Sequence, residues 1–264
     1  MRILFLLAAA LLALGSAPAS AKTRCLMIAE AVSGDIVHAE GEQCDEGMGP
    51  ASTFKLALAV IGFDDGVLVD ADNPAWPYKG EYDALRPADR ATTTPRRWLT
   101  ESVLWFSRKL VAELGPERFA SYVANLDYGN ADVSGDPGAD NGLTHSWLNS
   151  SLQITPRQQA IFVRRLVLGD LPVVPGVREK TIEALPKFDG GGGWTITGKT
   201  GTGYLRTANG TLGKRQFGWF VGFGEREGAS YVFAYLIEDE KAGGTAAGPR
   251  ARDDLLGRWS GLVK

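Results

Sequence analysis

The spacing of hydrophobic residues changes along the chain, and each change marks a different kind of predicted secondary structure. Residues 24–43 contain two apolar runs on either side of a Ser-Gly-Asp turn signal, which is typical of two strands joined in a hairpin. In the middle of the chain, apolar residues recur at the three- and four-residue spacing of helices. After the glycine run at 190–193, they alternate or cluster as in buried strands.

The middle of the chain predicts several helices separated by polar segments. Pro50 lies near the start of the first one, and Thr155 and Gln158 have the spacing of a capping box at the start of another. The predicted helices cover residues 51–63, 95–115, 116–126, 155–168 and 176–185. The segments 70–95 and 128–146 are rich in turn-forming residues and are expected to be irregular.

The last third of the chain predicts strands and one final helix. The strands cover residues 194–204, 216–225 and 230–239, and the amphipathic helix covers residues 248–264. Short turns between successive strands favour an antiparallel sheet that both ends of the chain complete. We therefore expect an α/β protein, α+β by its strand order, with an antiparallel sheet flanked by helices and a mostly helical lobe.

The expected division places residues 22–60 and 186–264 in a sheet lobe and residues 61–185 in a helical lobe. A cleft between two lobes is a common place for a small-molecule site.

The N-terminal residues 1–21 have the pattern of a secretory signal peptide. Arg2 precedes the apolar stretch 3–14, and Ala19-Ser20-Ala21 is a small-x-small cleavage signal. The alternative is a membrane anchor, but the stretch is too short to span a bilayer. We expect cleavage after Ala21, a mature chain of residues 22–264 and a periplasmic location. The formal net charge of −3 gives no basic surface for nucleic acid.

Two cysteines, Cys25 and Cys44, flank the predicted hairpin. If Gly34 and Asp35 form its loop, the two cysteines are equally far from the loop and face each other across the strands. We expect a disulfide in an exported protein, while two free thiols are the alternative because a bulge would shift the register.

Only two histidines occur, His38 and His145, and there is no Cys-x-x-Cys motif. Metal enzymes need three or four convergent ligands, so we expect no metal site. The scarcity of histidine also argues against a Ser-His-Asp triad. A hydrolytic serine in this chain needs a different base.

Ser52 and Lys55 form an S-x-x-K pattern at the start of the first predicted helix. Residues three apart share a helix face, so the hydroxyl and the amine can meet, and the free N–H groups of the first turn favour negative charge. A serine nucleophile needs both a base and oxyanion donors. The alternative is a capping serine beside a lysine that reaches solvent.

Lys199-Thr200-Gly201 lies in an alternating strand just after the glycine run. A cation beside a hydroxyl suits a substrate carboxylate, and the N–H of Thr202 can point at an oxyanion. The two motifs together favour a nucleophilic serine over a capped helix.

Five motifs in one order make the chain similar to the class D serine β-lactamases, the oxacillinase family. The resemblance runs from about Cys44 to the C-terminus. The motifs are Pro50-Ala51-Ser52-Thr53-Phe54-Lys55, Ser102-Val103-Leu104, Tyr128-Gly129-Asn130, Trp147-Leu148 with Ser151-Leu152, and Lys199-Thr200-Gly201. The resemblance implies the fold shared by serine β-lactamases and penicillin-binding transpeptidases.

The resemblance implies a role for each matching residue. Ser52 matches the nucleophile that becomes acylated, and Lys55 matches a lysine carried as an N-carboxylated (carbamylated) side chain that serves as general base. Ser102 matches the serine that relays a proton to the β-lactam nitrogen. Trp147 matches the tryptophan whose indole N–H holds the carbamate.

The remaining matches concern substrate binding. Lys199 and Thr200 match contacts to the substrate carboxylate, and the N–H groups of Ser52 and Thr202 match the oxyanion hole. An arginine near the C-terminus completes the carboxylate site in this family; Arg252 aligns best, and Arg250 is the alternative.

Elementary chemistry supports a modified Lys55. Burial among apolar neighbours lowers the pKa of a lysine, and the neutral amine is the form that reacts with CO2. We expect no cofactor other than the CO2 or bicarbonate needed for carbamylation. Leu104 departs from the family's Ser-x-Val, and Tyr128 is either a site residue or a loop anchor.

Two other readings share some of these motifs. A cell-wall peptidase has S-x-x-K and K-T-G but usually Ser-x-Asn in place of residues 102–104. A β-lactam sensor domain stays acylated and is normally tethered to a membrane segment. We expect a β-lactamase that acts on small-molecule β-lactams, with no membrane partner after signal cleavage. The preferred β-lactam and the choice between monomer and homodimer stay open.

Overall fold

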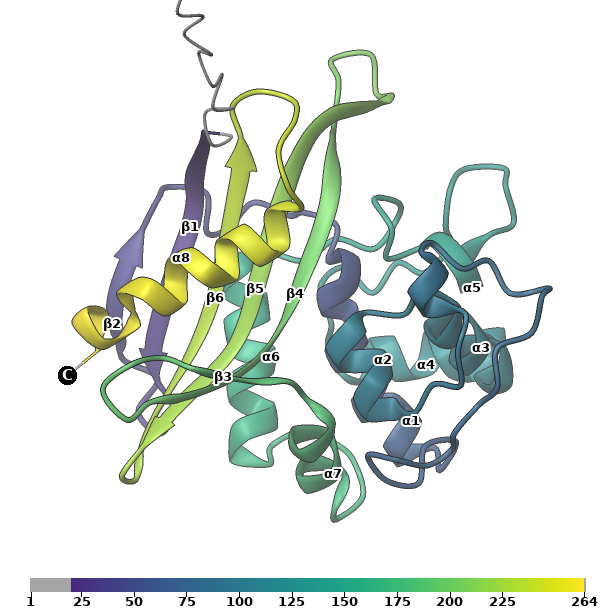
Figure 1. The fold of residues 1–264 in the computed structure, drawn as a ribbon, viewed down its shortest axis with the longest axis horizontal. Helices are drawn as coiled ribbons and strands as arrows, with labels where there is room; N and C mark the ends of the chain where they lie inside the picture. The colour runs from purple at the N-terminus through teal and green to yellow at the C-terminus, as the bar shows by residue number, and fades with distance from the viewer. Residues whose placement is uncertain (1–19, 264) are drawn as a thin grey trace, which may run out of the picture.

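The computed structural model describes residues 20–263, so the predicted signal peptide lies outside the described residues except for Ser20 and Ala21. Six antiparallel strands form one sheet in the order β2-β1-β6-β5-β4-β3 (Figure 1). The strands are β1 (Ala21–Glu30), β2 (Ile36–Glu40), β3 (Lys187–Asp189), β4 (Thr195–Arg206), β5 (Leu212–Arg226) and β6 (Ala229–Asp239). Both ends of the chain contribute to the sheet, and the predicted fold class is confirmed.

The helices fall mainly between β2 and β3. They are η1 (Ala51–Thr53), α1 (Phe54–Asp64), η2 (Pro87–Asp89), α2 (Pro95–Glu101), α3 (Leu104–Leu114), α4 (Pro116–Asn125), α5 (Gly142–His145), α6 (Pro156–Leu168), α7 (Val177–Ala184) and α8 (Ala247–Leu262). Among the described residues, no helix is long and apolar enough to cross a membrane.

The sheet buries both of its faces, which explains its long apolar strands. Along β1, Leu26 and Ile28 belong to the cluster under α8, while Met27 and Ala29 belong to the larger core on the other face. This alternation follows from the two-residue period of a strand. Helix α8 lies in front of the sheet in Figure 1 and α6 behind it, where α6 packs on β1, β5 and β6.

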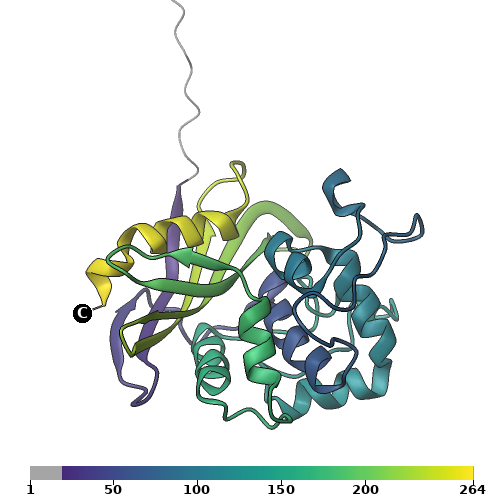
Figure 2. The same ribbon diagram turned by 60° about the horizontal axis from the view of Figure 1, so that its bottom comes forward.

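Helix α1 is buried on every side from Phe54 to Phe63, as expected for a helix at the centre of a layer. Other helices of the middle segment, drawn in blue to green, gather around it beside the sheet (Figure 2). The division into two lobes stays a prediction. Helix α6, which that division assigns to the helical lobe, packs directly on the sheet.

The prediction of one continuous helix over residues 95–115 is wrong in one respect, because the helix is interrupted at Ser102. Helix α2 ends there with Ser102 in the left-handed region at φ 61° and ψ 37°, and α3 begins two residues later. Residues on both sides keep helical spacing, so the apolar pattern did not reveal the break.

The predicted disulfide between Cys25 and Cys44 is confirmed, with a Cα–Cα distance of 5.0 Å. The register used to predict it is wrong. Leu26 pairs with Glu40, a bulge follows Ile28, and β2 ends before Cys44 is reached. The bridge therefore joins β1 to the segment that leads from the hairpin to η1.

Candidate active site

Ser52 and Lys55 meet where a short 3-10 turn runs into α1. Ser52 lies in η1, and the amine Nζ of Lys55 is 3.1 Å from the hydroxyl Oγ of Ser52. The side chain of Lys55 is enclosed, with 1% of the residue exposed. The predicted pairing of hydroxyl and amine is therefore present, with the amine closed to bulk water and Ser52 partly exposed.

Strand β4 runs past this turn and brings the second motif beside it. A Cβ built on Gly201 would lie 3.0 Å from the carbonyl oxygen of Pro50 and 3.2 Å from the backbone nitrogen of Ser52. A strand residue with a side chain would force β4 away from η1. The neighbouring Thr202 accepts a hydrogen bond at its Oγ1 from the backbone N–H of Gly248, 2.8 Å away.

Ser102 is brought to the same place by the break between α2 and α3. The amine of Lys199 donates to Ser102 Oγ at 3.2 Å and to the carbonyl oxygen of Thr200 at 3.1 Å. An amine that donates to Ser102 Oγ leaves the serine proton available for another acceptor. Residues 50 positions apart in the sequence, Ser52 and Ser102, thus each face a buried lysine.

Burial lowers the pKa of both lysines, because the charged amine is disfavoured away from water. The pKa of Lys55 lies well below its usual value, first because the amine is buried and then because the cation of Lys199 is near; the Asp89 carboxylate acts in the opposite direction. Burial lowers the pKa of Lys199 to about 7, with further lowering from Arg252 and Arg86. Burial therefore favours the neutral amine of Lys55, which is the form able to accept a proton.

Trp147 carries a buried hydrogen-bond donor that is not used. The residue is fully buried, its ring stacks on Phe54 at 5.6 Å, and its carbonyl oxygen accepts from the N–H of Ala51. Among the described residues, its indole Nε1 has no hydrogen-bond partner. An unpaired buried donor is costly, so this position suits an added acceptor near the start of α1.

The two candidate arginines of α8 have different surroundings. Arg250 forms an ion pair at 2.6 Å with Asp239, whose carboxylate is fully buried. Arg252 lies over the ring of Phe188 at 5.2 Å. Its positive charge lowers the pKa of Lys199. The assignment of Arg252 to a substrate carboxylate stays a prediction, with Arg250 as the alternative.

Both histidines are engaged elsewhere. His38 Nε2 contacts Glu40 at 2.7 Å, and His145 Nδ1 contacts Thr144 Oγ1 at 2.8 Å. Within residues 20–263, no three side chains of the metal-binding types come together. Lys55 is therefore the base candidate in contact with Ser52.

One charged pair beside the site was missed from the sequence. Asp89 in η2 is 1% exposed and is held by the guanidinium of Arg86 at 2.6 Å, and the charges of both residues affect the pKa of Lys55. Arg86 also donates to the carbonyl oxygen of Glu101, next to Ser102. The pair lies in the irregular segment 70–95, where no periodic pattern marked it. The three-residue spacing of Arg86 and Asp89 is the one local signal.

The chain is similar to several known proteins. The chain matches the family described as penicillin binding protein transpeptidase domain over residues 19–255. It is 42% identical over 236 residues to β-lactamase OXA-9 of Klebsiella pneumoniae, which covers 88% of this chain and 85% of that protein. It is 32% identical over 234 residues to β-lactamase OXA-1 of Escherichia coli, with 88% and 82% covered.

A solved structure leads to the same class. The crystal structure of the class D β-lactamase OXA-427 superposes with a TM-score of 0.83 at 40% identity and covers 92% of this chain and 100% of that chain. The chain belongs to the penicillin-binding transpeptidase family and, within it, to the class D serine β-lactamases. The predicted family and enzyme class are confirmed.

Proposed function

We propose that this chain hydrolyses β-lactam antibiotics through an acyl-enzyme on Ser52, with Lys55 carbamylated as the general base, and so confers β-lactam resistance. The observation that carries the proposal is the contact of 3.1 Å between Ser52 Oγ and a lysine amine that is buried and low in pKa. This arrangement supplies a base to a serine without histidine.

Acylation follows from the positions of the side chains. Ser52 Oγ attacks the β-lactam carbonyl carbon while its proton leaves toward the Lys55 side chain. The backbone N–H groups of Ser52 and Thr202 are the proposed donors to the oxyanion, because Gly201 lets β4 approach η1. The ring C–N bond then breaks, and Ser102, which accepts from Lys199, passes a proton to the departing nitrogen.

The residues around Lys55 suit a carbamate. A neutral buried amine reacts with CO2, and the resulting anion needs hydrogen-bond donors in an apolar setting. The unpaired indole N–H of Trp147 is such a donor. When present, the carbamate supplies a base for acylation and for activation of the water that releases the product.

A negatively charged substrate group fits the other side of the site. Lys199, Thr200 and Arg252 are the proposed partners of the substrate carboxylate. Protonated Lys199 is favoured when an anion is nearby, so binding of the carboxylate and protonation of Lys199 support each other. This coupling suits a lysine whose pKa is about 7 in the free protein.

The proposal includes a periplasmic location for the mature chain, supported by the N-terminal export pattern and by the class of the relatives. Small β-lactams are the proposed partners. The mild negative charge gives no reason to expect nucleic-acid binding.

The first test is turnover of a chromogenic cephalosporin in excess. Sustained hydrolysis, with loss of both turnover and covalent adduct in Ser52→Ala, supports the proposal. A stoichiometric burst that stops would instead indicate a penicillin sensor that stays acylated.

Carbamylation is tested by NMR with 13C-bicarbonate. We expect a carbamate signal in the native protein and none in Lys55→Ala, and a weaker signal in Trp147→Phe that recovers at higher bicarbonate. Trp98→Phe is the matched control, because the indole of Trp98 is also buried but already donates to Ser107 at 2.8 Å. Absence of any signal in the native protein, together with full activity of Lys55→Ala, would refute the proposed base.

A further inference from the structure

We propose that Gln159 is a positioning residue that holds the hydroxyl of Thr53 and thereby fixes the turn that carries Ser52. The inference rests on the proposed role of Ser52 as nucleophile. It assigns a function to a buried polar network that lies beneath the active site and contacts no reacting atom.

The network is a continuous chain of hydrogen bonds. The side-chain amide of Gln159 donates through Nε2 to Thr53 Oγ1 at 2.9 Å, and Thr53 Oγ1 donates to the carbonyl oxygen of Pro50 at 2.6 Å. The backbone N–H of Thr53 donates to the same carbonyl oxygen at 3.1 Å. Two bonds from Thr53 to Pro50 therefore close a turn in which Ser52 is an interior residue.

Gln159 determines the direction of these bonds. Because its amide donates to Thr53 Oγ1, the hydroxyl proton of Thr53 is left to point at Pro50. The amide itself is oriented by Tyr128, whose hydroxyl donates to Gln159 Oε1 at 3.4 Å. Burial raises the pKa of Tyr128, so its phenol remains a donor.

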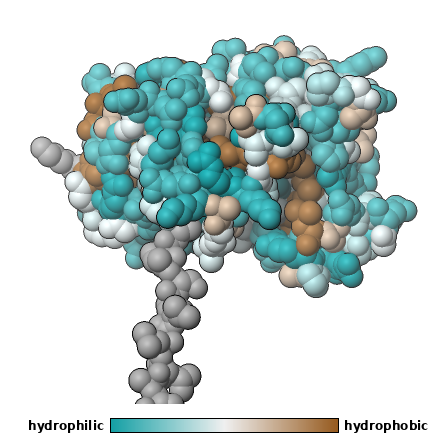
Figure 3. Space-filling model, turned by 90° about the horizontal axis from the view of Figure 1, so that it is seen from above, coloured by the Kyte–Doolittle hydropathy of each residue, from teal (hydrophilic) through white to brown (hydrophobic). Residues whose placement is uncertain are grey.

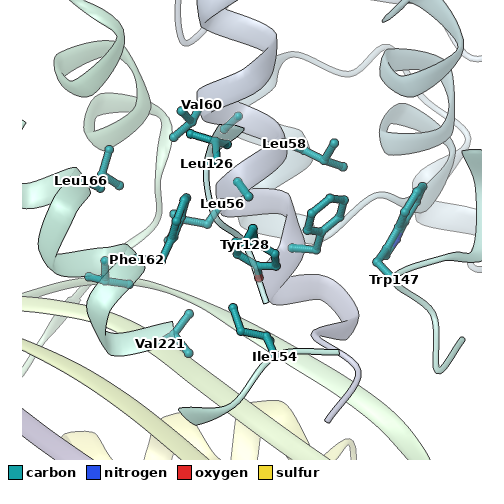
Figure 4. Close-up of a cluster of buried hydrophobic side chains, with 14 of the residues drawn as sticks. Leu56, Leu58, Val60, Leu126, Tyr128, Trp147, Ile154, Phe162, Leu166 and Val221 are labelled. Atoms are coloured by element: carbon teal, nitrogen blue, oxygen red, sulfur yellow. The ribbon is translucent and has the colours of Figure 1, made fainter. Parts of the chain in front are cut away.

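The burial of these groups argues for a specific role. Thr53, Gln159 and Tyr128 are each 1% exposed, and Tyr128 belongs to the larger apolar core. Figure 4 shows Tyr128 between α1 and Phe162 of α6, with Leu56 and Ile154 close by. A glutamine of this kind costs free energy to bury unless its bonds are made, and a fully bonded buried network fixes one geometry.

The helix that carries Gln159 gives the turn a rigid reference. Helix α6 packs on β1, β5 and β6, and β5 pairs along its length with β4, which carries Lys199. Gln159 thus ties the turn of Ser52 to the same sheet that positions the proposed carboxylate site. In this network Tyr128 orients Gln159 from within the core.

The inference is tested by single-turnover acylation with enzyme in excess, which separates the acylation rate from substrate binding. Thr53→Val and Gln159→Met each keep the approximate shape of the side chain and remove the hydrogen bond between Gln159 and Thr53. We expect each to slow acylation about ten- to a hundredfold while the half-saturation concentration changes less than about twofold. Because the bonds act as one unit, the double variant is expected within about threefold of the slower single variant.

Two further variants separate positioning from packing and stability. Thr53→Ser keeps the hydroxyl and is expected to acylate within about threefold of the native rate. Gln158→Met removes the neighbouring glutamine, which caps α6 from an exposed position. It is expected to lower the melting temperature and to leave the acylation rate within about twofold of native.

The outcomes also separate this inference from the proposed function. If mass spectrometry of the native protein shows no adduct on Ser52, the proposed function fails. If the adduct forms at the native rate in Gln159→Met, or if Thr53→Ser is as slow as Thr53→Val, the positioning role alone is wrong. Should Gln159→Met not fold, the two Thr53 variants decide.

Discussion

The backbone of Gly201 passes the backbone nitrogen of Ser52 at a distance that leaves little room for a side chain. A Cβ on Gly201 would lie 3.0 Å from the backbone nitrogen of Thr53 and 3.2 Å from that of Ser52. The proposed nucleophile and the strand of Lys199 are thus joined by a close backbone contact. The proposed oxyanion donors on the two segments, the N–H groups of Ser52 and Thr202, keep their spacing only while this contact persists.

Gly201→Ala is therefore expected to lower kcat/KM by about tenfold or more, because β4 must shift by a fraction of an ångström from η1. Steady-state kinetics measure the effect. Gly80→Ala is the matched control: among the described residues nothing lies within 4 Å of a Cβ there, and its activity should equal that of the native protein. Native kinetics in Gly201→Ala would show that the contact is not needed for catalysis.

The two arginines of α8 are expected to give opposite phenotypes. Arg252→Ala should raise KM for carboxylate-bearing β-lactams with little change in stability, since Arg252 pairs with the exposed Asp253. Arg250→Ala should lower the free energy of unfolding by about 3 kcal/mol, because it removes a partner of a buried carboxylate. Urea titrations and KM values measured on both variants decide the assignment. Reversal of the two phenotypes would make Arg250 the carboxylate ligand.

The lowered pKa of Lys199 predicts that the free energy of unfolding depends on pH. Its pKa is about 7 in the folded protein and near 10.5 when exposed, so between these values the unfolded chain binds a proton that the folded protein lacks. The free energy of unfolding should therefore rise with pH over this window, by at most about 1.4 kcal/mol per pH unit. Below about pH 7 both states are protonated and the cost of burying the cation is fully present.

Lys199→Met removes this contribution. Stability is measured by urea titrations in bicarbonate-free buffer at pH 7, 8 and 9, which are about one pH unit apart, the step to which the slope refers. The native protein should gain stability relative to the variant as pH rises. Parallel curves for the two proteins would contradict the lowered pKa of Lys199. The cation of Lys199 also lowers the pKa of Lys55, so the comparison is repeated with Lys55→Met in both proteins to remove the titration of Lys55.

Loss of the disulfide should affect stability more than activity. Cys25 and Cys44 are 19 residues apart, and replacing both by alanine is expected to lower the free energy of unfolding by about 2–4 kcal/mol. The segment before Ser52 is also held by paired backbone bonds between Met48 and Ile154, so kcat/KM should change little. Thiol labelling of the unreduced native protein should find no free cysteine. A large loss of kcat/KM would show that the bridge supports the active site.

Local patterns predicted the elements that carry the two main motifs. The apolar residues around Lys55 marked a buried helix, and the alternation around Lys199 marked a strand, because both signals depend on neighbours in the sequence. Figure 3 shows that the outer surface seen there is mostly hydrophilic, with apolar side chains in separate groups, as the alternating patterns require.

Features that depend on distant contacts were not predictable in the same way. No proline or glycine marks the break at Ser102, and the hydrogen bond that its side chain accepts comes from Lys199, 97 residues away. The hairpin pattern did not reveal the bulge after Ile28, nor that β2 ends at Glu40, before Cys44 is reached. Asp89 is buried, and the irregular sequence pattern of residues 70–95 did not indicate that burial.

The left-handed backbone at Ser102 has a parallel at Ala51, with φ of 61° and 50° respectively. Glycine adopts this conformation without the penalty of about 1–2 kcal/mol that other residues incur. Ser102→Gly should accordingly relieve strain while removing the hydroxyl that the proposed proton relay needs. Selection for thermal stability alone would favour that exchange, and selection for antibiotic resistance would oppose it. The protein thus gives up some stability at the position where it keeps its proposed relay serine.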